Sequence, residues 1–168
     1  MKMILAAMFE PVYLALTSYM ARSGLMLFAN SQGISGAAKQ AALAAIVDGK
    51  TLKAALYLAS ATTGPTNSVY TATGELAASG NYSTGGASVT NANSAGLTST
   101  TAYWTPSASI AWTALTSSGA FDCAMIYSTT DTNRNIGTFT FGSQSITAGN
   151  FSLTMPTNDS TTGLVRFA

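Results

Sequence analysis

The chain has 168 residues, enough for about one domain with a buried core, and only 8% of them are charged, against roughly 25% in an average soluble protein. Its formal net charge of +1 excludes the basic field that proteins use to bind nucleic acid. It contains no histidine, which excludes Ser-His and Cys-His nucleophile pairs and the commonest zinc ligand. A surface poor in charge and rich in hydroxyl groups favours a protein packed against other subunits over the alternative, a neutral secreted β domain.

Residues 1–28 form an apolar N-terminal stretch. Its first run resembles the start of a secretory signal, but Glu10 and Pro11 interrupt it early. Together with Arg22 they also break up the stretch of about 20 apolar residues that a membrane span needs. We therefore expect neither a signal peptide nor a membrane partner. Pro11 suits the first turn of a short helix, which Gly24 can close.

This N-terminal arm is the candidate subunit interface, because its apolar side chains recur at helical spacing and then continue as an apolar run. The arm either packs on its own domain or docks on a neighbouring subunit, and the sequence leaves both open. The charge is uneven: residues 1–53 carry five basic and two acidic residues (+3), and residues 54–168 carry two basic and four acidic residues (−2). Such asymmetry can steer an arm onto a neighbour. The candidate interface residues are Val12, Leu16, Tyr19, Met20, Leu25, Leu27 and Phe28.

A second helix is predicted over AAKQAALAAIV, residues 37–47, with Ser35 as its N-cap and Gly49 at its end. Alanine is the best helix former, and Ser is a favoured N-cap. Leu43 and Val47, with Ile46, lie on one side of this helix. We group residues 1–50 as a helical extension and residues 51–168 as a β-sandwich domain.

The remaining chain predicts a mainly β fold, an antiparallel sandwich or jelly roll of about eight strands, because short apolar runs alternate with turn-rich segments. Residues 119–156 predict a three-strand antiparallel meander. In its first run, Phe121, Cys123, Met125 and Tyr127 share one parity and hence one face. The expected strands cover residues 52–58, 87–89, 98–104, 110–115, 121–127, 136–141, 146–155 and 163–167.

The β part offers little catalytic chemistry. Cys123 is the single cysteine and is expected to be buried as a small hydrophobic residue. Glu75 and Asp122 could converge as a glycosidase pair, but the carboxylates are scattered. Glu75 is better explained as a structural partner of Arg134, of Arg166 or of a turn amide. We therefore predict no catalytic residues, no metal site and no cofactor.

Several segments of the β part together resemble small structural proteins that tailed bacteriophages encode among their virion genes. The resemblance covers about residues 52–168 and leaves residues 1–49 outside it. It implies a β-sandwich that binds the virion, and it brings no catalytic residues with it. The segments that carry it are LKAALYLAS (52–60), YTATGELAASGNYSTGG (70–86), GAFDCAMIY (119–127), Asn-Arg-Asn (133–135), FTFG (139–142), ITAGNFSLTMP (146–156) and GLVRF (163–167).

The resulting expectation is a non-enzymatic virion protein, a decoration or cement protein that stabilises the capsid lattice through apolar contacts. Its partners would be the major capsid protein or other virion proteins and copies of itself, as a dimer or trimer, with no nucleic acid and no membrane. It would be made in the host cytoplasm and reside on the capsid surface. The alternatives are a tail, neck or receptor-binding component and a secreted carbohydrate-binding or hydrolytic β domain that uses Trp104 or Trp112, which we otherwise expect in the core.

Overall fold

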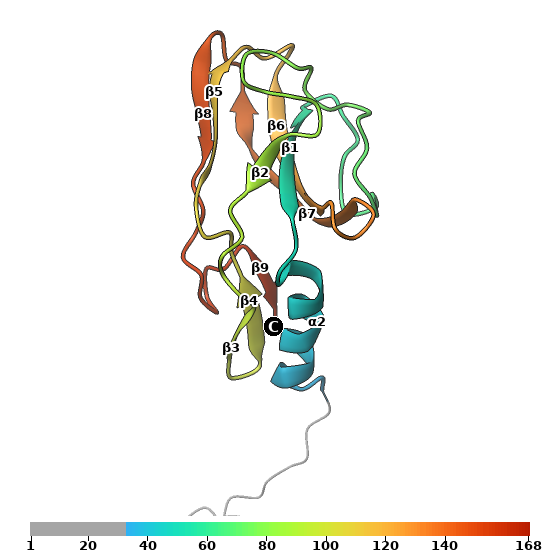
Figure 1. Ribbon diagram of the computed structural model, residues 1–168, viewed down its shortest axis with the longest axis vertical. Coiled ribbons are helices and arrows are strands. Elements are labelled where there is room, and N and C mark those ends of the chain that lie inside the picture. The colour runs from blue at the N-terminus through green and yellow to red at the C-terminus, as the bar shows by residue number, and fades with distance from the viewer. Residues whose placement is uncertain (1–32) are drawn as a thin grey trace, which may run out of the picture. The chain divides into compact units, whose positions relative to one another are not determined.

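The computed structural model describes residues 33–168, so all seven candidate interface residues lie outside the described part. Within it the fold is mainly β, with antiparallel strands and one helix, as expected (Figure 1). None of the helical structure described here is long and apolar enough to cross a membrane. The elements are α2 (Gly36–Val47), β1 (Leu52–Leu58), β2 (Ala87–Val89), β3 (Gly96–Thr98), β4 (Thr101–Trp104), β5 (Ile110–Leu115), β6 (Phe121–Ser128), β7 (Arg134–Gln144), β8 (Gly149–Leu153) and β9 (Val165–Phe167).

The strands form three sheets, and every pairing between them is antiparallel. The largest has the order β2-β1-β6-β7, a second has the order β3-β4-β9, and β5 pairs with β8. Figure 1 shows the β5–β8 pair beside the four-stranded sheet, and the β3-β4-β9 sheet next to α2. The main hydrophobic core joins these parts, since it includes Leu43 of α2, Leu56 of β1, Trp104 of β4 and Trp112 of β5.

Strand β1 is buried on both faces, which explains its nearly continuous apolar sequence. Ala54 and Leu56 belong to the main core. Ala55 and Tyr57 point to the other face, where they form a second cluster with residues of β6. This second cluster supports the site described below.

A β-bulge in β6 corrects the expectation that four of its residues share one face. Phe121 pairs with Leu58, and Cys123 pairs with the adjacent Tyr57, so Asp122 is one extra residue in the ladder. A bulge of this kind reverses the parity of the strand. Phe121 therefore lies in the main core, whereas Cys123 and the alternate residues after it lie in the second cluster.

The expected meander is wrong in its last step, because β8 does not pair with β7. Strand β6 pairs with β7 as expected, but β8 pairs with β5. Phe151 of β8 stacks on Trp112 of β5 with 5.8 Å between ring centroids and meets Phe121 edge-on at 5.0 Å. These aromatic contacts stabilise the pairing of β8 with β5. The expected strand over residues 98–104 covers β4 and the turn before it, and β3 is a further strand that pairs with β4. The described residues therefore contain nine strands.

Helix α2 begins and ends as predicted and packs on the β part. The Ser35 side chain accepts a hydrogen bond from Ala38 N at 3.2 Å, and Gly49 has a φ of 65°. Leu43 and Val47 are fully buried in the main core. Asn91 holds the C-terminal end, because its Nδ2 donates to the carbonyl of Val47 at 2.6 Å.

Candidate functional site

The carboxylate of Glu75 is the centre of a buried network of hydrogen bonds. Its Oε1 accepts from the hydroxyl of Tyr82 and from Gly85 N, each at 2.7 Å. Its Oε2 accepts from the hydroxyl of Tyr70 at 2.5 Å. Glu75 is only 8% exposed, and no lysine or arginine of the described residues forms an ion pair with it. Hydrogen bonds to a charged acceptor are the strong ones, so three donors can replace the water that burial removes.

Glycines allow the chain to reach this position. Glu75 lies in an isolated bridge with Tyr57 of β1, and Leu76 N donates to Leu56 O at 2.9 Å. Gly86 has a φ of 71°, and a Cβ at this position would lie 1.8 Å from Ala54 O. Only glycine permits both this conformation and this contact. The loop after Glu75 therefore lies directly against β1.

Two further tyrosines complete the network. The hydroxyl of Tyr57 donates to Thr71 O at 2.6 Å, and that of Tyr127 donates to Gly85 O at 2.7 Å. The rings of Tyr70 and Tyr127 stack with 4.5 Å between centroids. Glu75, Tyr57, Tyr70, Tyr82 and Tyr127 are called the Glu75 network below.

All four tyrosines of the Glu75 network have a pKa above the ordinary value. Burial is the largest cause in each case, and the proximity of Glu75 adds to it, through its charge or its hydrogen bond. A general acid or base works best with a pKa near the operating pH. The tyrosine hydroxyl groups therefore remain protonated at neutral pH and act as fixed hydrogen-bond donors. Their role in the Glu75 network is structural.

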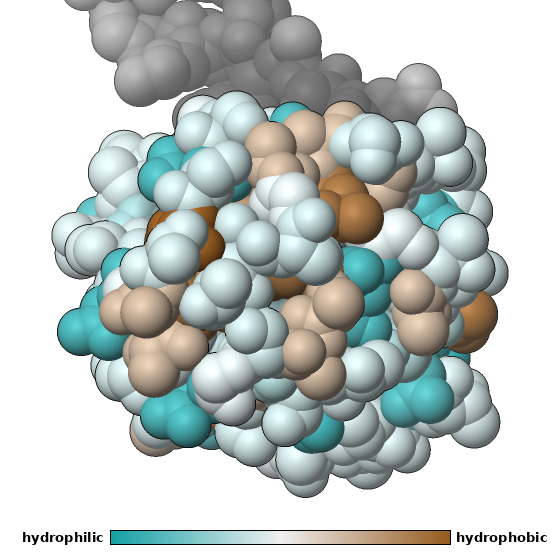
Figure 2. Space-filling view, turned by 90° about the horizontal axis from the view of Figure 1, so that it is seen from above, coloured by the Kyte–Doolittle hydropathy of each residue, from teal (hydrophilic) through white to brown (hydrophobic). Residues whose placement is uncertain are grey.

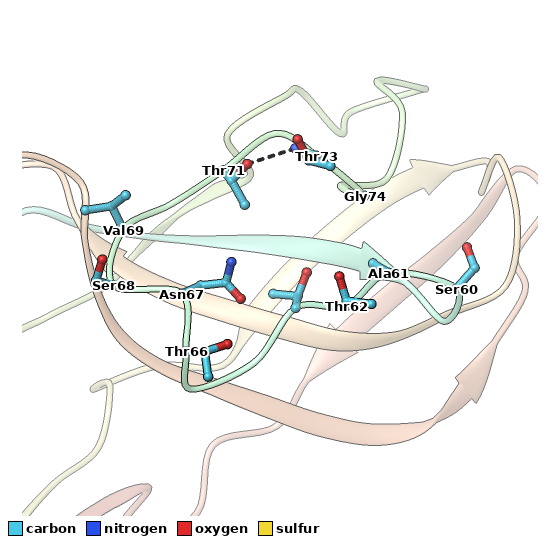
Figure 3. Close-up of a pocket in the computed structure, with 11 residues that line it drawn as sticks. Ser60, Ala61, Thr62, Thr66, Asn67, Ser68, Val69, Thr71, Thr73 and Gly74 are labelled. Carbon is cyan, nitrogen blue, oxygen red and sulfur yellow. Dashed lines mark hydrogen bonds between the residues drawn. The ribbon is translucent and has the colours of Figure 1, made fainter.

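A polar pocket lies beside the Glu75 network, in the loop that follows β1 (Figure 3). Its volume is about 540 Å³. Figure 3 shows the two arms of the loop facing each other, with Thr62 and Asn67 on one arm and Thr71 and Thr73 on the other. We call it the hydroxyl pocket, and it is lined by Ser60, Ala61, Thr62, Thr63, Thr66, Asn67, Ser68, Val69, Thr71, Thr73 and Gly74.

A smaller pocket of about 140 Å³ lies between β6, β7 and the segment around β8. Its walls include Phe139, Phe141, Leu153 and Met155, which are only partly buried. The two polar residues among its lining are threonines. This pocket therefore offers mainly apolar contact.

Two side chains singled out as possible glycan-binding residues lie in the interior. Trp104 is 0% exposed and Trp112 is 2% exposed, which confirms them as core residues. Trp104 Nε1 donates to Asn91 Oδ1 at 3.1 Å. Neither ring forms a surface platform for a sugar, so the residues proposed for that alternative function do not supply it.

Cys123 is buried, as expected. Burial, and next the charge of Asp122, raise the pKa of its thiol to about 11. The thiolate is the reactive form of cysteine. Cys123 is therefore poorly suited to act as a nucleophile.

Sequence reasoning anticipated one of the three donors to Glu75. A turn amide was among the expected partners, and Gly85 N fills that role. Arg134 and Arg166 do not: Arg166 donates to Thr161 O. The tyrosine hydroxyl groups were missed, because no local sequence signal links them to Glu75.

The surface of the described part carries few strong charges. Figure 2 shows one end of it covered mainly by side chains of intermediate hydropathy, with strongly hydrophilic ones scattered among them. The one ion pair found among the described residues joins Lys50 Nζ to Asp131 Oδ1 at 3.1 Å. The same residues contain no group of three or more potential metal ligands.

A scan against protein-family models, a search of curated proteins and a search of solved structures each found no match to this chain.

Proposed function

We propose that this chain is a non-enzymatic structural protein of a tailed bacteriophage virion, which decorates the head and stabilises its lattice. In this proposal the described strands form a β-sandwich, with the β5–β8 pair as one layer and the β2-β1-β6-β7 sheet as the other. The sequence resemblance over residues 52–168 points to virion proteins. The low content of charged residues favours a protein that packs against other subunits.

The observation that carries the proposal is that the Glu75 carboxylate has a structural role. Glu75 carries the one buried carboxylate among the described residues. This carboxylate accepts hydrogen bonds from three groups of the same chain. The tyrosines around it are held protonated by burial. Titratable groups in an active site have pKa values near the operating pH and are accessible to substrate. In this chain the Glu75 network instead connects loops to a sheet. This role supports a structural protein rather than an enzyme.

Attachment to the head is assigned to the apolar arm, residues 1–28. Burial of apolar surface is the main driving force of association, and the arm has few charges to desolvate. The partner surface would belong to the major capsid protein or to a further copy of this chain, in a dimer or trimer.

The test is binding to isolated phage heads by the full chain and by a variant that lacks residues 1–28. We expect loss of binding with an unchanged unfolding transition of the body. Two full-length triple variants separate the parts of the arm: Val12→Ser/Leu16→Ser/Tyr19→Ser for the helical stripe, and Leu25→Ser/Leu27→Ser/Phe28→Ser for the run after it. Unchanged occupancy of the heads by all three variants would refute the assignment.

Copy number distinguishes head from tail. A decoration protein covers a lattice and is present in hundreds of copies, whereas a neck or tail ring with closed rotational symmetry holds about six to a dozen. Quantitative mass spectrometry of purified virions measures this number. A count near a dozen would replace the head assignment by a neck or tail assignment.

A further inference from the structure

The hydroxyl pocket is lined by uncharged residues, eight of which have a hydroxyl or amide side chain. None of its eleven lining residues is Lys, Arg, Asp or Glu. Anionic ligands such as phosphates and carboxylates bind where Arg, Lys or a helix N-terminus provides positive charge, and metal ions need carboxylate or imidazole ligands. The chemistry of the wall therefore selects against charged ligands.

Most of the hydroxyl groups in the pocket form no hydrogen bond within the described part of the protein. Thr71 Oγ1 accepts from Thr73 N at 3.2 Å, and Asn67 Oδ1 accepts from Gly64 N at 2.9 Å. The other hydroxyl groups form no hydrogen bond to any group of the described residues. Each can donate one hydrogen bond and accept others. These hydroxyl groups belong to Ser60, Thr62, Thr63, Thr66, Ser68 and Thr73.

Threonine adds a second property to the pocket, because each Oγ1 stands next to a methyl group. The methyl groups, with Ala61 and Val69, give apolar contact between the polar groups. A sugar ring has the same alternation, with C–H groups on its faces and hydroxyl groups around its edge. The pocket volume of about 540 Å³ falls within the range of roughly 300–1,000 Å³ typical of small-molecule sites.

Both arms of the loop are fixed to the sheet, so the pocket is formed before a ligand arrives. Asn135 Nδ2 donates to Asn67 O at 2.8 Å, and Asn135 N donates to Ser68 O at 3.0 Å. On the other arm, Tyr57 holds Thr71 O at 2.6 Å, and Leu58 N donates to Gly74 O at 2.9 Å. A preformed site avoids the entropy loss of ordering a loop on binding.

From these observations we infer that the hydroxyl pocket binds a neutral carbohydrate, of about one or two sugar units. The inference is independent of the proposed attachment to a phage head. The lining contains no aromatic ring on which a sugar could stack. Binding therefore depends on hydrogen bonds made in competition with water, and we expect a weak affinity for a single sugar, with a Kd on the order of 1 mM.

The test is a titration of the isotope-labelled full chain followed by two-dimensional NMR. The probes are glucose, galactose, N-acetylglucosamine and maltose, each up to tens of millimolar. We expect saturable shifts of the backbone amides of residues 60–74 with at least one of these sugars. Glucose 6-phosphate is expected to bind no better than glucose, and inorganic phosphate is expected to leave these amides unchanged. The inference is overturned if no sugar produces saturable shifts in residues 60–74, or if phosphate produces them.

A matched pair of variants tests the hydroxyl groups themselves. Thr62→Val/Thr66→Val keeps the shape of the pocket and removes two free hydroxyl groups, and we expect at least tenfold weaker binding. The control Thr98→Val/Thr140→Val makes the same change at two exposed strand positions outside the pocket and is expected to bind like the parent. Ser68→Ala, a smaller change, should weaken binding as well. Equal affinities of all three variants and the parent would also overturn the inference.

Discussion

The hydroxyl of Tyr82 donates a hydrogen bond of 2.7 Å to Glu75 Oε1, and both residues are buried. The same hydroxyl accepts from Leu56 N at 3.0 Å. Tyr82→Phe therefore removes one of three donors to a buried carboxylate and leaves a buried amide unpaired. We expect the free energy of unfolding to fall by about 1.5–3 kcal/mol, measured by urea denaturation at neutral pH.

Tyr103→Phe is the matched control for this prediction. Tyr103 is a half-buried residue of β4, and its hydroxyl forms no hydrogen bond with any group in residues 33–168. Its loss is expected to change the free energy of unfolding by less than about 0.5 kcal/mol. If both variants lose the same stability, the Glu75 network does not have the role that its geometry indicates.

The raised pKa values of the network predict a loss of stability at high pH. Tyr57, Tyr70, Tyr82 and Tyr127 have a higher pKa in the folded chain than the ordinary value of about 10 that applies after unfolding. The neutral hydroxyl is therefore favoured by folding. The stabilisation is complete below the unfolded pKa of about 10 and is lost as the pH rises toward the folded values.

Urea denaturation at a series of pH values, together with the ultraviolet absorbance of tyrosinate, measures this effect. We expect these four tyrosines to ionise together with unfolding, while the chain in urea ionises near pH 10. Glu75→Gln removes the nearby negative charge and should lower the pH at which they ionise. Reversible ionisation of all seven tyrosines near pH 10 in the folded chain would contradict the prediction.

The contact between Gly86 and β1 predicts a large effect of a single methyl group. Gly86→Ala would place a Cβ 1.8 Å from Ala54 O at a φ of 71°, so the loop must move away from the strand. We expect a loss of about 2–4 kcal/mol in the free energy of unfolding, as for other severe steric and backbone conflicts.

Gly142→Ala provides the control, because a Cβ at Gly142 meets nothing within 4 Å. Alanine is preferred over glycine within a strand by roughly 0.5–1 kcal/mol, so this variant should be as stable as the parent or slightly more stable. Differential scanning calorimetry compares the two. A Gly86→Ala protein as stable as Gly142→Ala would show that the loop does not lie against Ala54.

Local pattern was sufficient to predict the helix and most of the strands. Ser35, the alanine-rich stretch and Gly49 predict both ends of α2, because capping and helix propensity depend on near neighbours. The apolar run over residues 52–58 likewise predicts β1. The mainly β, antiparallel character of the fold follows from these local signals.

What the sequence could not supply depends on contacts between distant segments. The parity of residues 121–127 is regular, and only the pairing with β1 shows that Asp122 is an extra residue. The pairing of β8 with β5 brings Phe151 onto Trp112, and these residues are far apart in the sequence. The Glu75 network could not be predicted from the sequence either. Tyr57, Glu75 and Tyr127 lie close together only because β1 pairs with β6 and with the segment around Glu75. No local rule indicates such convergence.

Asn91 is predicted to fasten α2 to the sheets. Its Nδ2 donates to Val47 O and Lys50 O at 2.6 and 3.1 Å, and its Oδ1 accepts from Trp104 Nε1. Asn91→Ala leaves carbonyl groups at the helix end without this donor, which we expect to lower the free energy of unfolding by about 1–3 kcal/mol. Tryptophan fluorescence should change at the same time, since Trp104 loses one partner.

The control for Asn91 is Asn81→Ala. Asn81 donates to the hydroxyl of Thr113, and this hydrogen bond is exposed. Water replaces an exposed partner, so the expected change is within about 0.5 kcal/mol. Equal losses in the two variants would show that burial of the Asn91 contacts does not matter.

The environment of Cys123 predicts a protected thiol. Burial and the charge of Asp122 raise its pKa to about 11, whereas a cysteine in the unfolded chain has a pKa of about 8.5. At pH 8 the thiolate fraction is then lower in the folded chain by roughly two orders of magnitude, and reaction with a maleimide or an aromatic disulfide should be slower to a similar extent. The rate in urea measures the unprotected thiol and serves as the control. Folded and unfolded rates within a few-fold of each other would mean that the face of β6 carrying Cys123 opens to solvent, and the second cluster would then be less stable than its burial indicates.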